Sequence, residues 1–437
     1  MVNIYNYLKN VWKKVSLDFR QNSFAYLVLL VLLMLPLPYI FSSIAAIILV
    51  VYGIIFYPKG AFQNSKSLWI PIVLYFGIAV SYFWSITPSL TISALSKQIP
   101  LLLFPLVFFW HRLENENALQ KVKNGYVFGY TFYALFWLLK AAIKYGITGS
   151  THVFFYHELV TNDLNAIHVS LYLALGFFMV LEKKKRTLWD YFSMGILALC
   201  IVLLSSKNII VLFFILALFR TYYLFRNQLS KRLKWTVFIG LLSIGVIFSG
   251  KVKERFYLEI ASNTEAVSIN QDIGKPTEKV FNVSIKDAWN RPVFNKNDFF
   301  PGTALRVYQF RIFKEMMQED GKWFTGYGAN ATDLKIKQKR IAYQLYEGYD
   351  VFNFHNQYIQ FFAEIGVFGF LLCIVMVLVN LKTAINRKDF VHFSFAILII
   401  SLFLTESFLS RQRGVLFFTL FYCIYNSLAH KETESNV

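Results

Sequence analysis

Long apolar runs recur along most of the chain and strongly limit what it can fold into. An α-helix needs roughly 17–25 mostly apolar residues to cross a bilayer. Of the 437 residues, 56% are hydrophobic and only 16% are charged. The pattern predicts an all-α polytopic membrane protein with about twelve transmembrane helices. The runs lie near residues 24–39, 41–57, 68–84, 95–111, 125–143, 165–181, 190–206, 208–225, 234–250, 356–381, 391–407 and 414–429.

Basic residues indicate the orientation of these runs. The formal charge of +19 invites a nucleic-acid interpretation, but many Lys and Arg residues lie in short loops between apolar runs, including 182–186 and 220–234. Loops rich in Lys and Arg face the cytoplasm. Topology therefore accounts for the charge, and we expect both termini to be cytoplasmic and no nucleic-acid partner.

One long polar segment interrupts the pattern of short loops. Residues 251–354 separate nine N-terminal runs, within 1–250, from three C-terminal runs, within 355–437. The predicted topology makes this segment a large extracytoplasmic loop. Within it, "TALRVYQFRIFKEMMQ" at 303–318 has the apolar spacing of an amphipathic helix. The loop is therefore expected to contain short helices.

The run that follows the loop begins with unusually many polar groups, "FNFHNQYIQFFAEIGVFGF" at 352–370. Asn356, Gln360 and Glu364 are spaced i, i+4 and i+8, so a helix places them in one stripe. Such a stripe faces the bundle interior or a wet cavity, because lipid does not solvate it. Hydrogen bonding between helices, with Gly366 and Gly369 allowing close contact, is the alternative to a functional site.

His355 precedes this stripe at the extracytoplasmic mouth of the run. A neutral imidazole can take a proton from a hydroxyl as a general base, and a hydrogen-bonded structural histidine is the alternative. His168 is the other histidine at comparable depth. No HExxH spacing or carboxylate cluster suggests a metal, and the three cysteines show no paired spacing. We expect no metal and no cofactor.

Several cations map to the same extracytoplasmic rim. Arg306 and Arg311 lie five residues apart on the loop helix, so one of the two is expected to face the membrane cavity. Lys207 lies where two apolar runs meet, and Arg411 and Arg413 precede the last run. A solvated or snorkelling cation is the alternative for each. Together with His355 these cations predict a lipid-linked phosphate as ligand.

Four motifs resemble those of a known family. In "HNQYIQFFAEIGVFG" a His-Asn pair is followed by nine residues, Gly, two residues and Gly, which resembles the signature of the O-antigen ligase and polymerase superfamily. "ALRVYQF" is similar to the family's loop arginine with an aromatic four residues later, here Arg306 and Phe310. "WFTGYGAN" resembles its Gly-x-Gly turn. In "LLSSKNII" Lys207 replaces the usual arginine, which keeps the charge but loses two-pronged phosphate binding.

The resemblance implies glycosyl transfer at the periplasmic face of the bacterial inner membrane, in lipopolysaccharide biosynthesis. The donor would be a glycan on undecaprenyl diphosphate. The acceptor would be a sugar hydroxyl on lipid A-core for a ligase, or on a lipid-linked glycan for a polymerase. His355 would act as general base in an inverting reaction. The diphosphate would be held by Arg306, Lys207, Arg411 and Arg413, with Asn356, Glu364, His168, Gly366 and Gly369 in supporting positions.

Other functions remain open at this stage. The long loop and complete motif favour a ligase over a polymerase, and a protein-glycosylating oligosaccharyltransferase of the same superfamily is a third candidate. A polysaccharide flippase or transporter, from a different class, would often show repeated halves, whereas the two halves here differ. Convergence of Lys207, Arg306 and His355 on one cavity would favour an enzyme, and wide separation would favour transport.

Overall fold

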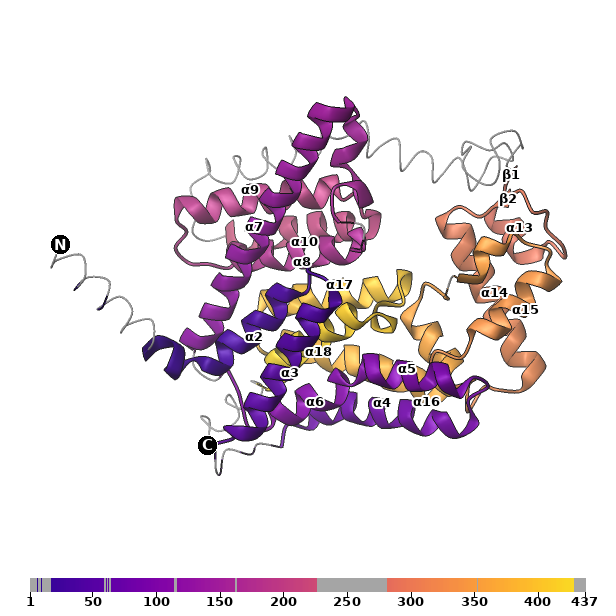
Figure 1. Ribbon diagram of the computed structural model, residues 1–437, viewed down its shortest axis with the longest axis horizontal. Coiled ribbons are helices and arrows are strands. Elements are labelled where there is room, and N and C mark those ends of the chain that lie inside the picture. Colours follow the sequence, from indigo (N-terminus) through magenta and orange to yellow (C-terminus); the bar gives the residue numbers. More distant parts are fainter. Residues whose placement is uncertain are drawn as a thin grey trace.

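The computed structural model describes residues 6, 9, 17–58, 60, 62, 64–113, 116–161, 163–225, 281–351 and 353–427. This part of the chain is mostly helical (Figure 1). Its one sheet pairs β1 (Phe281–Asn282) with β2 (Asp298–Phe299) in parallel. The prediction of a mostly helical protein is therefore confirmed.

Prolines stand at the start of three N-terminal helices. Pro38 caps the start of the second helix, so the first two form a hairpin. Pro88 and Pro100 occupy first positions of two further helices, where a missing N–H costs nothing. The helices are α2 (Ser23–Met34), α3 (Tyr39–Ile55), α4 (Trp69–Val80), α5 (Pro88–Gln98), α6 (Pro100–Phe108), α7 (Glu116–Thr148), α8 (Ala166–Leu181), α9 (Leu188–Leu203) and α10 (Lys207–Phe225).

The C-terminal part consists of α16 (Gln357–Asn386), α17 (Phe390–Thr405) and α18 (Gln412–Ser427). Eleven of the predicted apolar runs coincide with helices, and the run near 234–250 lies outside the described residues. Four described helical stretches are long and apolar enough to cross a membrane, namely Lys66–Trp84, Pro88–Phe108, Asn117–Thr148 and Gln357–Asn386. Five shorter apolar helices accompany them. The total of about twelve spans stays a prediction.

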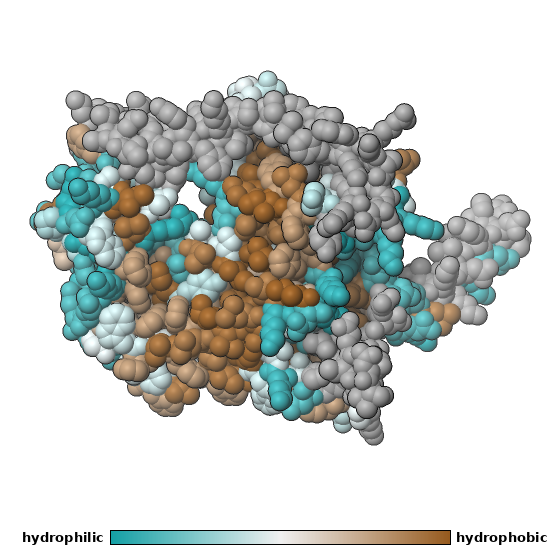
Figure 2. Space-filling model, turned by 180° about the vertical axis from the view of Figure 1, so that it is seen from behind, coloured by the Kyte–Doolittle hydropathy of each residue, from teal (hydrophilic) through white to brown (hydrophobic). Residues whose placement is uncertain are grey.

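The helix α18 lies at the centre of the helical bundle. Every residue from Arg413 to Ser427 is buried. A helix that is covered on all sides belongs to the interior of a large bundle, and Figure 1 shows the other helices arranged around α18. Seen from behind in Figure 2, hydrophobic residues cover the middle of the molecule, while hydrophilic residues gather on the left over residues 281–351.

Residues 281–351 form their own small core beside the bundle. They contain α13 (Ile285–Asn290), α14 (Gly302–Asp320) and α15 (Asp333–Ala342). The helix predicted at 303–318 is confirmed as α14, which buries Tyr308, Ile312 and Met316. It ends at Gly321, whose φ of 62° suits glycine. We call this part of the chain the loop domain; its predicted extracytoplasmic position stays a prediction.

The loop domain is attached to the bundle at a break in α16. Gly366 has φ 69° and ψ −165°, which interrupts the helix. The "WFTGYGAN" turn uses the freed backbone groups: Tyr327 N donates to Ala363 O and Gly328 N to Glu364 O, both at 2.8 Å. Gly366 thus permits a break and a docked loop, rather than the close contact between helices that its spacing also suggested.

We expect Gly366→Ala to lower the free energy of unfolding by at least about 2 kcal/mol, because the residue has a left-handed φ and its Cβ would overlap the carbonyl oxygen of Phe324. Thermal unfolding of the detergent-solubilised protein measures the effect. Gly195→Ala in α9 is the control, since nothing lies within 4 Å of its added Cβ. Equal stability of the two variants would contradict this account of the break.

Candidate functional site

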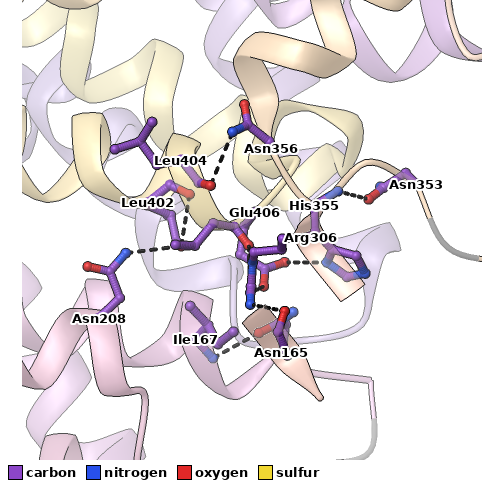
Figure 3. Close-up of polar contacts among 12 residues, drawn as sticks. Asn165, Ile167, Asn208, Arg306, Asn353, His355, Asn356, Leu402, Leu404 and Glu406 are labelled. Atoms are coloured by element: carbon purple, nitrogen blue, oxygen red, sulfur yellow. Dashed lines mark hydrogen bonds and ion pairs between the residues drawn. The ribbon is translucent and has the colours of Figure 1, made fainter. Parts of the chain in front are cut away.

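Three segments that are distant in sequence meet at the carboxylate of Glu406 (Figure 3). His355, just before α16, places Nδ1 3.6 Å from Glu406 Oε2. Arg306, in the first turns of α14, places Nη2 3.7 Å from Oε1. Glu406 itself follows the last residue of α17. We call these three residues the Glu406 cluster.

Backbone contacts fix the guanidinium of Arg306. Nε and Nη2 both donate to Thr405 O, at 3.2 and 2.9 Å, and Nη1 donates to Gly302 O at 2.9 Å. The end of α17 therefore binds the guanidinium through the carbonyl of Thr405 as well as through the neighbouring carboxylate. These bonds hold α14 of the loop domain against the bundle.

Tight local geometry positions His355. Its φ of 44° is uncommon for a residue other than glycine, and its backbone N–H donates to Asn353 Oδ1 at 3.0 Å. The next residue, Asn356, caps α16 by accepting from Ile359 N, and its Nδ2 donates to Leu404 O at 3.2 Å. The start of α16 is thereby tied to the end of α17, which places the imidazole beside Glu406.

The pattern of exposure in the Glu406 cluster suits acid–base chemistry. The side chain of Glu406 is only 10% exposed, whereas those of His355 and Arg306 are 23% and 35% exposed. A carboxylate at Nδ1 favours the tautomer with its proton there, so that Nε2 carries the lone pair. The buried carboxylate lies beside the imidazole and the guanidinium, whose side chains stay partly exposed, while Nε2 of His355 is itself buried.

The start of α10, which carries Lys207, contacts the same end of α17. Lys207 opens α10, and its neighbour Asn208 donates through Nδ2 to Ser401 O and Thr405 Oγ1, both at 3.0 Å. Thr405 is also the residue that holds Arg306. The segments that carry Lys207, Arg306 and His355 therefore all contact the C-terminal end of α17.

Three other predicted residues lie near η6 (Phe408–Ser410), the short turn that follows the cluster. His168 of α8 is buried, with its ring against that of Phe408 at 4.5 Å. Arg411 is exposed where η6 joins α18. Arg413 is buried and donates to Asp163 O at 2.5 Å and Leu37 O at 2.8 Å. Its observed contacts hold α18 to neighbouring segments, and its diphosphate role stays a prediction.

Arg311 belongs to the interior of the loop domain. It donates to Glu315 Oε1 at 2.9 Å, and its guanidinium lies 4.6 Å from the centre of the Tyr343 ring. Burial alone would raise the pKa of Glu315, but hydrogen bonds from Tyr343, Lys339 and Arg311 hold that pKa below its ordinary value. Of the two arginines on α14, Arg306 contacts Glu406 and Arg311 contacts Glu315.

The polar stripe on α16 is buried as predicted. Gln360 and Glu364 are each 2% exposed, and Gln360 Nε2 donates to Glu364 Oε1 at 2.6 Å. Glu364 also accepts, through its backbone carbonyl, from the docked turn. A Cβ on Gly369 would overlap Ile365. These contacts stabilise the region around the helix break, and a supporting role of Glu364, Gly366 and Gly369 in the reaction stays a prediction.

The sequence analysis did not identify Glu406 or Asn208 as candidate site residues. Glu406 stands at the end of an apolar run, where an ionisable group is by itself a functional signal. No spacing links it to His355 or Arg306, because the contacts cross between separate segments. Asn208 directly follows Lys207, and an uncharged amide next to a lysine carries no sequence signal of its own.

An apolar helical bundle that holds a histidine, a carboxylate and an arginine together at one end defines a membrane protein with a built polar site. Residues 192–374 match the sequence model of the O-antigen ligase family. The match contains Lys207, Arg306 and His355, so this part of the chain is similar to the O-antigen ligase family. No curated protein matches it.

We expect Glu406→Gln to loosen residues 353–356 and the start of α14, because His355 and Arg306 then share no negative charge. Losing a charged partner costs about 1–3 kcal/mol, which corresponds to roughly 5- to 150-fold faster amide exchange. Hydrogen exchange read by mass spectrometry measures this. Glu347→Gln, at an exposed site of the loop domain, is the control. Equal exchange in both variants would contradict a bridging role for Glu406.

Proposed function

We propose that the protein is an O-antigen ligase-like glycosyltransferase that moves a glycan from undecaprenyl diphosphate to a sugar hydroxyl of lipid A-core. The reaction takes place at the periplasmic face of the inner membrane, with the loop domain in the periplasm and both termini in the cytoplasm. The observation that carries the proposal is the Glu406 cluster, in which one buried carboxylate contacts both a candidate base and a candidate phosphate-binding cation.

The proposed reaction begins with proton removal. Glu406 holds Nδ1–H of His355, and Nε2 takes the proton of the acceptor hydroxyl as its oxygen attacks the anomeric carbon. The new glycosidic bond forms on the face opposite the diphosphate, the bond from carbon to the diphosphate oxygen breaks, and the configuration inverts. General-base catalysis of this kind contributes roughly 10²–10⁴ in rate.

Cationic side chains would stabilise the leaving group. Negative charge grows on the diphosphate as the bond breaks, and cations fixed in advance at a partly buried site stabilise it strongly. Arg306 is already oriented by Thr405 O and Gly302 O while 35% of its side chain stays exposed. Lys207 would add a point charge from the adjoining helix end, and Arg411 lies exposed nearby along the chain. We propose that these cations make transfer independent of a metal.

The same geometry supports an enzyme over a transporter. Arg306 and His355 come from different segments and reach one carboxylate, and the segment bearing Lys207 contacts the same helix end. A polymerase that uses a lipid-linked glycan as acceptor is the second candidate, since the cluster would serve either acceptor equally.

The glycans of a strain that lacks this protein should separate the two candidates. For a ligase, we expect lipid A-core to lose its long chains while lipid-linked polymer accumulates, because polymerisation continues without transfer. Lipid A-core that carries single-repeat chains instead would contradict the ligase and support the polymerase. A normal glycan profile would contradict both.

We expect His355→Ala to reduce transfer by about 10²-fold or more while the protein remains folded, because the general base is lost. The measurement is transfer from purified lipid-linked donor to lipid A-core, with thermal unfolding as the check on folding. His152→Ala, at an exposed position in η3 (Thr151–Phe154), should retain activity. Normal transfer by the His355 variant would rule out the base.

We expect Lys207→Arg to retain or raise activity, since a guanidinium binds phosphate oxygens in two prongs, whereas Lys207→Ala should raise the KM for the donor. Kinetics with varied lipid-linked donor distinguish the two variants, of which only Lys207→Arg keeps a positive charge. Equal activity of both would remove Lys207 from the phosphate site.

A further inference from the structure

One side of α14 contacts both the segment that carries the candidate base and the carboxylate beside it. Arg306, Gln309 and Phe313 stand at i, i+3 and i+7, so they lie on one side of the helix. Arg306 contacts Glu406, whereas Gln309 and Phe313 contact the segment just before His355. A single helix of the loop domain therefore reaches both partners of the contact between the imidazole and the carboxylate.

Gln309 donates through Nε2 to the backbone carbonyl of Asn353, two residues before His355. Gln309 is 3% exposed, and its buried Oε1 accepts no hydrogen bond from the part of the chain that the structure describes. A carbonyl oxygen only accepts, so the amide must turn its NH₂ group toward Asn353. Gln309 therefore acts on this segment through one hydrogen bond.

The bond from Gln309 continues through Asn353 to His355. Oδ1 of Asn353 accepts the backbone N–H of His355 at 3.0 Å, a bond that Figure 3 shows. Phe354, between these two residues, is 1% exposed, and its ring lies 5.9 Å from that of Phe313. Both peptide groups that flank Phe354 are therefore held, the first by Gln309 and the second by Asn353.

His355 needs this support because of its backbone conformation. Its φ of 44° lies in the left-handed region, which is unfavourable for a histidine. The strain of such a conformation is of the same order as the net contribution of one hydrogen bond. Loss of the bond from Gln309 would therefore let the backbone of His355 relax, and the imidazole would move relative to Glu406.

We propose that Gln309 is a positioning residue that holds His355 beside the carboxylate of Glu406. It acts through Asn353 rather than on a reactant. The inference rests on the proposed function, since it concerns the geometry of the general base. Arg306 has its own backbone contacts at the start of α14 and at the end of α17, so the proposed phosphate contact should survive loss of the Gln309 bond.

Gln309→Met tests the proposal, because it removes the amide while nearly keeping the shape of the side chain. We expect kcat for transfer from purified lipid-linked donor to lipid A-core to fall roughly threefold to tenfold, the effect of one hydrogen bond. The KM for the donor should stay unchanged. Gln318→Met, at an exposed position on the same helix, should change neither constant. A normal kcat for Gln309→Met, or a raised donor KM with kcat unchanged, would overturn the proposal.

Asn353→Ala is the second variant, and it removes the other bond of the same chain of contacts. Combined with Gln309→Met, it should lower kcat little further than either substitution alone, because both substitutions act on His355 by the same route. Effects on kcat that multiply would mean that the two residues act independently, and would overturn a route through Asn353.

Hydrogen exchange separates this inference from the proposed function. Peptides that cover residues 353–356 should exchange roughly threefold to tenfold faster in Gln309→Met than in Gln318→Met, whatever reaction the protein performs. Equal exchange in these variants would overturn the role of Gln309 while the general base stands. Faster exchange together with normal transfer by His355→Ala would instead overturn the general base, and with it the role of Gln309 in the reaction.

Discussion

The contact of Glu406 with both Arg306 and His355 is the interaction on which the arrangement of this site depends. A carboxylate with a 10% exposed side chain is costly unless charged or polar partners surround it. Here the partners come from the loop domain and from the start of α16, so the cost is offset only when these segments dock on the end of α17. The electrostatic requirement of one side chain thus fixes how the loop domain meets the bundle.

A second contact, made by the backbone, supports the first. The "WFTGYGAN" turn donates hydrogen bonds to carbonyls freed at the break in α16. This break lies about three helical turns beyond His355. Because α14 leads directly into the turn, one helix of the loop domain contacts the bundle at both ends: Arg306 at its start and the turn after its end. Gly366 permits this geometry, and the residues nearest to it are Phe324 and Thr325 rather than members of the Glu406 cluster.

The helices and part of the site could be predicted from the sequence because they depend on local patterns. Apolar runs and the spacing of α14 are local patterns, and each predicts a helix without knowledge of its neighbours. His355 and Arg306 stood out because they belong to short motifs. Glu406 has no such motif, since its partners are set by tertiary contacts. The run predicted at 95–111 lies within Pro88–Phe108, one stretch long enough to cross a membrane, in which α5 and α6 each start at a proline. A glycine such as Gly366 is compatible both with close helix packing and with a helix break, and the local sequence does not decide between the two.

Positive charge alone does not identify the cations that matter. Arg413 is held by two backbone carbonyls and lies over Tyr39, Arg220 pairs with Glu182, and Arg311 pairs with Glu315. Each of these stabilises the fold. Arg306 differs because its carboxylate partner is shared with a histidine and because its guanidinium stays partly exposed. The shared carboxylate joins a cation suited to phosphate and a base suited to a hydroxyl. The proposed transfer of a glycan from a lipid diphosphate to a sugar hydroxyl would use both groups, which is why we propose a role in the reaction for Arg306 and not for these other arginines.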